Sequence, residues 1–340
     1  MRTCSSGATR LDKWFTVMET VIQAIDRELI KRELTPDKFI GQTRKGNNLI
    51  FEVTAQDSPF TMREIGRLRE ISFRLGGGGT GKACDIDEFD TDPYDAYKQL
   101  IGWDKDDQEI IGGYRYIVCS ALDPKKMATT EILRFSDKFI YDYLPWTIEL
   151  GRSFIQPNYQ SANLRRKSIF ALDNLWDGLG ALVAKYENIR YFFGKVTMYT
   201  GYNSRARNIL LNFLHLYFPD PENLVTAAHP LDFNLNDPYI RSLFQGLEYK
   251  EALKVLQKEL KALGENIPPL IHSYMNLSPS MKVFDTAIND FFGGVEETGM
   301  LIKISDIYPE KIDRHVMPIR RWALDKKNKW WKRFKKHTSR

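Results

Sequence analysis

The order of hydrophobic patterns through the first two thirds of the chain constrains its fold most strongly. Segments with the apolar pattern of strands and segments with the 3.6-residue spacing of helices follow one another as strand, helix, three strands, helix, strand, helix. The first seven of these segments are residues 48–55, 58–76, 96–103, 109–121, 146–155, 168–186 and 190–199. This order predicts an α/β (α+β) fold in which helices flank a sheet.

The helix over residues 58–76 carries clear start and stop signals. Ser58 precedes Pro59, a residue favoured at the first helical position, and Thr61 with Glu64 has the spacing of a capping box. A run of glycines begins at Gly76 and should end the helix there. We therefore expect a well-defined amphipathic helix directly after the first strand.

Helical patterns continue beyond this central part at both ends. Residues 11–34 and 239–263 have the spacing of amphipathic helices, and residues 300–304 read as a late strand. No linker rich in Pro, Gly or Ser divides the 340 residues, so we predict one enlarged domain with terminal extensions. The boundaries we expect are 1–47 for an N-terminal helical extension, 48–310 for the main domain and 311–340 for a C-terminal tail.

The chain lacks the signals of secreted and membrane-spanning proteins. No run of about 18 apolar residues occurs, and the first residues, MRTCSSGATRLDKW, lack the apolar stretch of a signal peptide. Cys4, Cys84 and Cys119 are odd in number and without C-x-x-C spacing, which argues against a disulfide framework and against a zinc site. We therefore expect a cytoplasmic protein with reduced thiols and no bound metal.

Two motif matches do not fit their surroundings. Residues 76–83, GGGGTGKA, match a phosphate-binding P-loop, but a helix rather than a strand precedes them and Ala83 stands where a magnesium-binding hydroxyl belongs. His215 and Asp220 have the H-x-x-x-x-D spacing of glycerolipid O-acyltransferases, with Pro219 between them. We interpret the first as a glycine loop and the second as a histidine on an apolar helix face.

Three separated segments, taken together, resemble one family. The first contains Arg69 and Phe73, the acidic stretch 85–95 (DIDEFDTDPYD) and Tyr97; the second is 149–157 (ELGRSFIQP); the third is 267–277 (IPPLIHSYMNL), followed by 284–294 (FDTAINDFFGG). In this order they resemble the hemolysin-type branch of the GCN5-related N-acyltransferase (GNAT) superfamily, which includes bacterial ornithine-lipid and glycine-lipid N-acyltransferases. The resemblance spans residues 48–307.

The resemblance implies a central mixed, mostly antiparallel sheet and an amide-forming acyl transfer. In this family a (3-hydroxy)acyl chain moves from acyl carrier protein to the α-amine of an amino acid such as glycine or ornithine, giving a lyso-aminolipid. The carrier's phosphopantetheine thioester is then a co-substrate, and no tightly bound cofactor is expected. A thioester already supplies a leaving group, so the enzyme needs orientation, amine deprotonation and oxyanion stabilisation.

The second segment supplies the catalytic candidates. In the family its strand splays from its neighbour and offers backbone groups to the acyl-thioester arm, here at Ser153, Phe154 and Ile155. Strand alternation places Glu149, Gly151 and Ser153 on one face and Leu150, Arg152 and Phe154 on the other. We predict Glu149 as the base, acting through water, with Arg152 beside the chemistry. A structural ion pair between Glu149 and Arg152 is the alternative.

Charged residues around this strand are candidates for binding the two substrates. Arg69, Phe73, Asp90, Asp95 and Arg115 are predicted to shape the acceptor pocket; a buried network of these arginines and aspartates is the alternative. The glycines of the R-x-x-G-x-G pyrophosphate cradle are absent from residues 156–167, QPNYQSANLRRK, which weakens the case for coenzyme A. The same segment offers Arg165, Arg166 and Lys167 to a carrier protein, or to solvent alone. For Pro269, Tyr274, Phe284, Asp285, Asn289 and Asp290 we expect roles in the fold and the pocket wall.

The C-terminal tail concentrates positive charge. Residues 326–340 hold eight Lys or Arg and no acid, so the net charge of +5 leaves −3 for the rest of the chain. Trp322, Trp330, Trp331 and Phe334 accompany these cations, a composition suited to an anionic membrane surface. A lipid product favours peripheral docking on the inner face of the membrane over nucleic-acid binding; a disordered tail is the alternative. Two other functions stay open: a coenzyme A-dependent acetyltransferase and a non-catalytic membrane adaptor.

Overall fold

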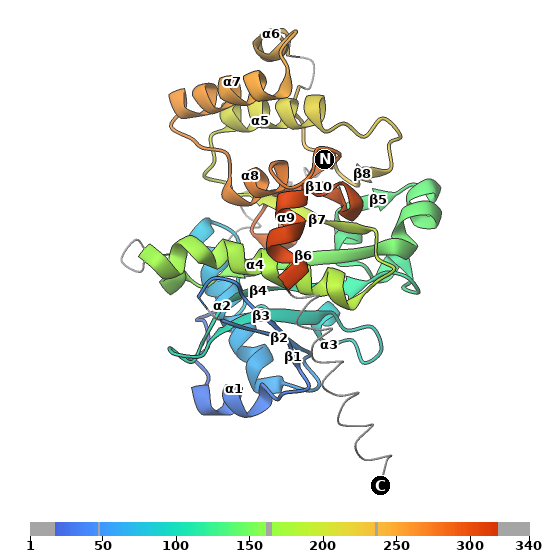
Figure 1. Cartoon of the computed structure of the whole chain (residues 1–340). Coiled ribbons are helices and arrows are strands. Elements are labelled where there is room, and N and C mark those ends of the chain that lie inside the picture. The colour runs from blue at the N-terminus through green and yellow to red at the C-terminus, as the bar shows by residue number, and fades with distance from the viewer. Residues whose placement is uncertain (1–17, 47, 161–164, 235–236, 319–340) are drawn as a thin grey trace, which may run out of the picture.

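A single mixed sheet organises the protein. The computed structural model describes residues 18–46, 48–160, 165–234 and 237–318, without the side chains of 165–173. Within these residues eight strands form one sheet in the order β1-β2-β3-β4-β6-β7-β10-β9, antiparallel except for β6 with β7 (Figure 1). The strands are β1 (Phe39–Gln42), β2 (Leu49–Val53), β3 (Lys98–Asp104), β4 (Glu109–Val118), β6 (Thr147–Ile155), β7 (Tyr191–Met198), β9 (Lys282–Asn289) and β10 (Val295–Lys303). The predicted class, a mostly antiparallel sheet flanked by helices, is confirmed.

Helices cover both faces of this sheet. Leu100 and Ile101 are neighbours on β3, yet Leu100 packs in the cluster of α4 and Ile101 in that of α2. The two helices therefore lie on opposite faces, because successive strand residues point to opposite sides. The helices are α1 (Arg27–Glu33), α2 (Pro59–Gly76), α3 (Glu88–Thr91), α4 (Arg165–Lys185), α5 (Ser204–Tyr217), α6 (Pro238–Phe244), α7 (Tyr249–Ala262), α8 (Pro269–Met275) and α9 (Pro309–His315). A second small sheet pairs β5 (Leu133–Phe135) with β8 (Val225–Ala227).

The N-terminal part is less helical than its sequence suggests. Within the predicted helix over 11–34, residues 18–26 are not helical, and α1 covers Arg27–Glu33 alone. Asp26 caps α1 by accepting a hydrogen bond from the backbone of Glu28. The unpredicted strand β1 follows and pairs with β2. Apolar spacing alone therefore overestimated the length of this helix. The N-cap residue Asp26 has a non-helical backbone, so the helix starts after it and the residues before it are not helical.

The helix α2 has the predicted bounds but a different cap. Ser58 makes no side-chain capping bond. The carboxylate of Glu33 instead accepts hydrogen bonds from the backbone of Phe60 (3.0 Å) and Thr61 (2.7 Å). The predicted capping box of Thr61 with Glu64 is therefore wrong: the free amides at the start of α2 are satisfied from α1, by a contact that local sequence does not show.

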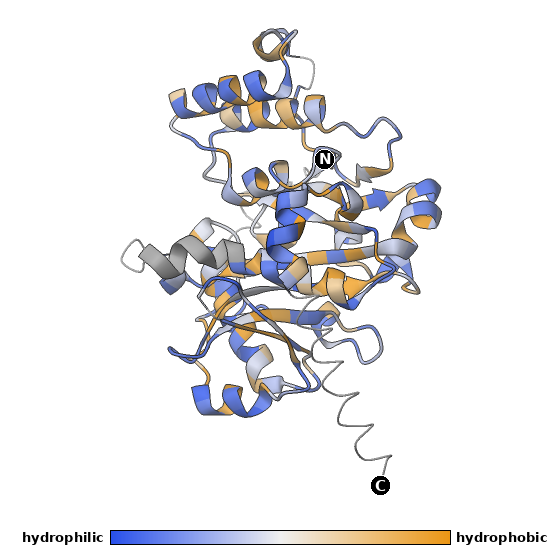
Figure 2. Ribbon diagram, viewed as in Figure 1, coloured by the Kyte–Doolittle hydropathy of each residue, from blue (hydrophilic) through white to orange (hydrophobic). Residues whose placement is uncertain are grey.

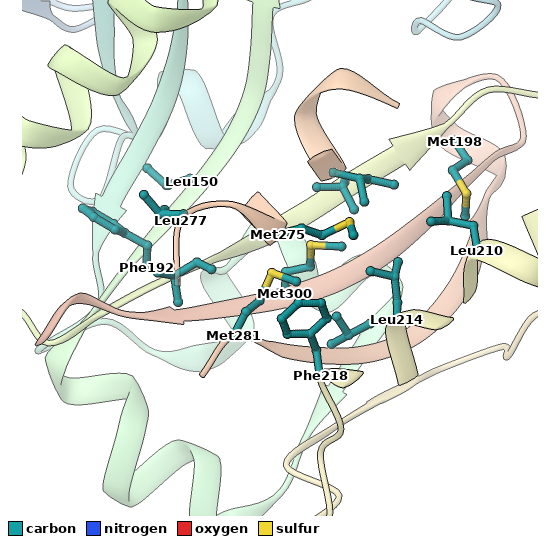
Figure 3. Close-up of a cluster of buried hydrophobic side chains, with 14 of the residues drawn as sticks. Leu150, Phe192, Met198, Leu210, Leu214, Phe218, Met275, Leu277, Met281 and Met300 are labelled. Atoms are coloured by element: carbon teal, nitrogen blue, oxygen red, sulfur yellow. The ribbon is translucent and has the colours of Figure 1, made fainter. Parts of the chain in front are cut away.

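The predicted helix over residues 239–263 is two helices. Gly246, at φ +73°, interrupts it between α6 and α7, in the left-handed region that favours glycine. Figure 2 shows hydrophilic and hydrophobic residues alternating along α7, whose buried side belongs to the cluster shared with α5. Figure 3 shows Met198, Met275 and Met300 within this cluster, where flexible methionine side chains fill the space between β7, β10 and the C-terminal helices.

The parallel strands β6 and β7 separate partway along their length. They pair from Thr147 with Tyr191 to Leu150 with Gly194, and no further. β6 continues to Ile155 while pairing with β4, and β7 continues to Met198 while pairing with β10. A wedge therefore opens in the middle of the sheet beyond Leu150, as the family resemblance implied for this strand.

Candidate active site

A cavity of about 870 Å³ occupies the wedge between β6 and β7. Glu149 and Arg115 line it from the side of the sheet that carries α3, and Leu175 of α4 lines it from the other side. The cavity therefore passes between the two strands. Further lining residues are Phe73, Tyr97, Thr129, Glu131, Arg152, Ser153, Phe154, Ile155, Lys195, Thr197, Tyr199, Phe292, Glu297 and the segment 265–270.

A bulge in β6 forms one wall of this cavity. Gly151 pairs with Arg115 and Phe154 with Gly113, so Arg152 and Ser153 together stand opposite Tyr114. Arg152 adopts φ +51°, which is rare for a side chain other than glycine. A bulge leaves one residue outside the ladder, so backbone groups of residues 152–153 are free to face a ligand.

The bulge also changes where Arg152 points. Its guanidinium lies 3.1 Å from Asp85 and 3.5 Å from Asp87, and Arg115 binds the same Asp87 at 2.6 Å. Arg115 pairs with Gly151, which alternation along β6 places on the same face of the sheet as Glu149. The groups that Arg152 contacts therefore lie on the Glu149 face. The prediction that Arg152 faces away from Glu149 is therefore wrong, because the bulge breaks the alternation at this residue.

Glu149 is a buried carboxylate held by two hydrogen bonds. Its side chain accepts from the Tyr97 hydroxyl and, at 2.9 Å, from the backbone N–H of Thr129, while the residue is only 1% exposed. Burial raises the pKa of Glu149, and the bonds from Tyr97 and Thr129 oppose this increase. A carboxylate with a raised pKa at the wall of a cavity is a stronger proton acceptor than an exposed one, which suits a general base. The hydroxyl of Tyr97 also accepts from the backbone N–H of Ala128 at 2.9 Å, which fixes its orientation.

Three arginines and three aspartates form the network behind the bulge. Arg69 binds Asp90 at 3.0 Å, with both side chains fully buried, and also bonds to Gln99. Burial alone would raise the pKa of Asp90, but Arg69 and Arg115 lower it. Burial alone would lower the pKa of Arg115, but the carboxylates of Asp90 and Asp87 raise it. This network joins α2, the acidic loop, β4 and β6 mainly through side chains.

The predicted site residues divide into three groups. Glu149, Arg152, Ser153, Phe154, Ile155, Phe73 and Arg115 line the cavity. Arg69 and Asp90 lie beneath it, in the buried network that was the alternative interpretation, and Asp95 pairs with Lys126 on the surface, outside the cavity. Arg165, Arg166 and Lys167 begin α4, and their side chains lie outside the described residues, as do Trp322, Trp330, Trp331 and Phe334.

The cavity contains charged residues that the sequence did not single out. Lys195 of β7 binds Glu297 of β10 at 2.9 Å, and Asn289 of β9 donates to the same carboxylate at 2.7 Å. Asn289 belongs to the third family-like segment, so one residue of that segment supports a charged wall of the cavity. Glu131 lines the cavity as an exposed carboxylate with no ion pair to the described residues. Lys195 lies within the predicted strand over 190–199, where a charged residue facing inward cannot be told from one facing solvent. Glu297 lies before the predicted strand over 300–304, so no pattern in the sequence marked it.

The two motif matches that were set aside do not form sites. The carboxylate of Glu70 accepts from the backbone N–H groups of Thr80 (3.1 Å) and Gly81 (2.8 Å), so the protein's own acid occupies part of the glycine loop. His215 lies in the last turn of α5, and its Nε2 makes no hydrogen bond to the described residues. The carboxylate of Asp220 accepts from the backbone of Leu224 instead.

The splayed parallel strands, the bulge between them and the buried carboxylate beside them define an acyltransferase of the GNAT fold. A sequence profile described as an acetyltransferase (GNAT) domain matches residues 68–167. The chain belongs to the GNAT N-acyltransferases and is an enzyme that transfers an acyl group.

Two bacterial proteins of this family are similar to the chain over most of its length. One, from Bacteroides thetaiotaomicron, is 50% identical over 304 residues, covering 88% of this chain and 90% of that protein. The other, from Phocaeicola vulgatus, is 47% identical over 304 residues, covering 88% and 93%. Both are named glycine N(alpha)-acyltransferase. No solved structure matches the chain significantly.

None of the helices that the structure describes combines the length and the apolar composition needed to cross a bilayer.

Proposed function

We propose that this enzyme transfers a fatty acyl chain from the thioester of acyl carrier protein to the α-amine of glycine, a step of lyso-aminolipid synthesis. Its similarity to two proteins named glycine N(alpha)-acyltransferase supports glycine as the acceptor. The cavity between β6 and β7, with Glu149 at its wall, is the observation that carries the chemistry. Ornithine, the acceptor of other enzymes in the same branch that the sequence resembles, is the competing amine.

The wedge suits the acyl donor. A thioester arm placed between the separated strands would lie along residues 151–155, which have no backbone partner on β7. The free backbone groups of the bulge at residues 152–153 are then available to the thioester carbonyl and to the negative charge that develops on its oxygen. Holding both reactants in this channel converts a two-molecule reaction into an oriented one.

The cavity also offers both charges that a glycine zwitterion requires. Arg152 and Lys195 can attract the carboxylate, and Glu131, which has no ion pair among the described residues, can attract the ammonium group. The ammonium group must first lose one proton, which Glu149 accepts directly or through water, and the neutral amine then attacks the thioester carbonyl. The C–N bond forms, the C–S bond breaks, and a second proton passes from the amine nitrogen to the departing thiolate, so that the carrier leaves as a thiol.

The carrier protein is proposed over coenzyme A because residues 156–167 lack the glycines that cradle a pyrophosphate. Arg165, Arg166 and Lys167 at the start of α4 offer positive charge to an acidic carrier. We expect acyl carrier protein to support a kcat/KM at least about tenfold above that of the same acyl coenzyme A, since charge complementarity chiefly raises association rates. Steady-state kinetics of the purified enzyme with glycine, ornithine or serine measures this ratio.

A matched variant separates the carrier contact from the chemistry. Arg165→Glu with Arg166→Glu should lower kcat/KM for the carrier-bound donor and leave the coenzyme A reaction unchanged. A higher kcat/KM for acetyl coenzyme A than for any carrier-bound acyl chain would instead support the coenzyme A-dependent acetyltransferase. Acylation of ornithine in preference to glycine would reject the proposed acceptor.

We also propose that the basic aromatic tail docks the cytoplasmic enzyme on the inner face of the membrane. Each cation near an anionic surface contributes about 1 kcal/mol, and indole rings favour the headgroup region. Removing residues 326–340 should therefore abolish sedimentation with vesicles that contain anionic lipid, with neutral vesicles as the control. Unchanged sedimentation would contradict the membrane contact, and retention on nucleic acid at physiological salt would favour the other polyanion.

A further inference from the structure

Lys195 is the first residue of β7 beyond the point where β6 and β7 part. The two strands pair as far as Leu150 with Gly194, so the backbone of Lys195 has no partner on β6. Glu149 pairs with Phe193, and alternation along β7 points Lys195 to the same face of the sheet as Phe193. Lys195 therefore lines the cavity from the face that carries Glu149.

A buried carboxylate holds the Lys195 side chain in place. Glu297 of β10 is 4% exposed; its Oε2 lies 2.9 Å from the Nζ of Lys195 and accepts from the side-chain amide of Asn289 at 2.7 Å. The other oxygen of Glu297 accepts from the Thr197 hydroxyl at 3.2 Å. Asn289 is fixed in turn, because its amide oxygen accepts from the backbone N–H of Phe291 at 3.1 Å. Lys195 is thus paired with a carboxylate that three strands orient, which gives its ammonium group a defined position.

This ion pair leaves Lys195 with unused donors. An ammonium group has three N–H donors, and in the part of the chain that the structure describes Lys195 makes no hydrogen bond or ion pair except that with Glu297. Its charge also acts on the cavity wall: burial raises the pKa of Glu131 and the pKa of Glu149, and Lys195 opposes both increases. The ammonium group is therefore available to an anionic group bound in the cavity.

Arg152, a second cation at the cavity wall, is engaged on more sides. Its guanidinium lies 3.1 Å from Asp85 and 3.5 Å from Asp87. It also lies over the ring of Phe292, 4.3 Å from the ring centre. Two carboxylates and an aromatic face therefore already surround this guanidinium. Of the two cations, Lys195 has the greater capacity to bind a further carboxylate.

We propose that Lys195 selects the acceptor by binding the carboxylate of an amino acid whose amine lies at Glu149, and that Glu297 positions Lys195 for this contact. One carbon separates the amine from the carboxylate in an α-amino acid, so both groups meet the same face of the cavity. Hydrogen bonds between charged groups are about twice as strong as those between neutral groups. Amines that lack a carboxylate lose this contact and should be poor acceptors. The inference deepens the proposed function: it rests on acyl transfer to an amine and applies to any α-amino acid as the acceptor.

A comparison of glycine with glycinamide tests the role of Lys195. Glycinamide has the same amine but a neutral amide in place of the carboxylate. With a saturating acyl donor, we expect the unmodified enzyme to prefer glycine about tenfold or more in kcat/KM, the effect of one hydrogen bond to a charged group. Lys195→Gln, which keeps an N–H donor beside Glu297, should lose this preference, chiefly through a higher KM for glycine. Lys195→Met combined with Glu297→Gln removes both charges of the pair and should lose the preference as well.

A second lysine of the sheet provides the control. Lys98 of β3 pairs with Glu52 at 3.3 Å and does not line the cavity. Lys98→Met should therefore leave the preference for glycine and the kcat/KM of both acceptors unchanged. Circular dichroism and thermal unfolding of each variant ensure that folded enzymes are compared.

Results that overturn the role of Lys195 differ from those that overturn the proposed function. Equal use of glycine and glycinamide by the unmodified enzyme, or a preference that survives in either Lys195 variant, would overturn this role and leave acyl transfer to glycine standing. Equal loss of turnover with both acceptors would also overturn it, because Lys195 would then act on the donor or on the chemistry. A Lys195-dependent preference for ornithine over ornithinamide, in an enzyme that does not acylate glycine, would support the role and reject the proposed acceptor. Failure to acylate any amino acid would overturn both.

Discussion

Replacing Glu149 by Gln should lower kcat about 10²- to 10⁴-fold while the protein stays folded, the usual contribution of a general base. Gln has the size of Glu and can still accept the backbone N–H of Thr129, so the fold around it is preserved. What is lost is the carboxylate that takes the proton of the attacking amine. Steady-state kinetics with a saturating acyl donor and glycine measures the change.

A second hydrogen-bonded tyrosine–glutamate pair, Tyr116 of β4 with Glu52 of β2, provides the matched control for Glu149. The Tyr116 hydroxyl donates to Glu52 at 2.5 Å, as that of Tyr97 does to Glu149, but Glu52 does not line the cavity. Glu52→Gln should leave kcat within about twofold of the unmodified enzyme, since surface-side changes away from the site rarely alter chemistry. Equal turnover of Glu149→Gln and Glu52→Gln would show that Glu149 is structural.

The pH dependence should follow the protonation of Glu149. Activity requires the ionised carboxylate, so kcat/KM rises with pH through the pKa of Glu149, which burial raises. The hydrogen bond from Tyr97 favours the ionised form and lowers that pKa. Tyr97→Phe should therefore shift the rising limb of the profile to higher pH, at the same glycine concentration. A shift to lower pH would contradict this assignment.

Arg69→Ala should cost about 3–5 kcal/mol of the free energy of unfolding, the largest stability loss we expect. The Arg69 and Asp90 side chains are both fully buried and 3.0 Å apart, so removing Arg69 leaves Asp90 with only the longer contact to Arg115 (3.4 Å) and leaves the buried network one positive charge short. Chemical denaturation followed by circular dichroism measures the loss. Because Arg69 does not line the cavity, the folded fraction should keep near-normal KM values.

Two further variants test whether the stability loss of Arg69→Ala arises from the missing buried charge. Lys126→Ala breaks the ion pair with Asp95 on the surface and should leave the unfolding midpoint unchanged, since exposed pairs contribute little. Arg69→Met combined with Asp90→Asn removes both buried charges and should recover part of the lost stability. A double variant less stable than Arg69→Ala would mean that packing, and not an unpaired charge, dominates.

The sequence predicts most of the sheet because its strands and helices alternate with clear periods. The strands around Glu149 and the bounds of α2 follow from that pattern. The cap of α2 cannot be predicted from that pattern, because the capping residue Glu33 belongs to a separate helix, α1. The break at Gly246 is also missed, since a single glycine within a helical pattern is compatible with either outcome.

The site is predictable where residues are adjacent in sequence and not where the fold brings them together. Glu149 and the residues 152–155 come from one family-like segment and do line the cavity. The bulge at Arg152 leaves no mark in a period-two pattern, so the direction of Arg152 was mispredicted. Lys195 and Glu297 are 102 residues apart and meet only because β7 pairs with β10.

Mass spectrometry of lipids from a bacterial host tests the central claim most directly. The host expresses either this chain or its Glu149→Gln form, at matched levels of folded protein. We predict a new N-acylglycine in the first host and none, or a trace, in the second. A new lipid present equally with both forms would contradict the role of Glu149, and no new acylated amino acid with the unmodified chain would contradict the proposed reaction.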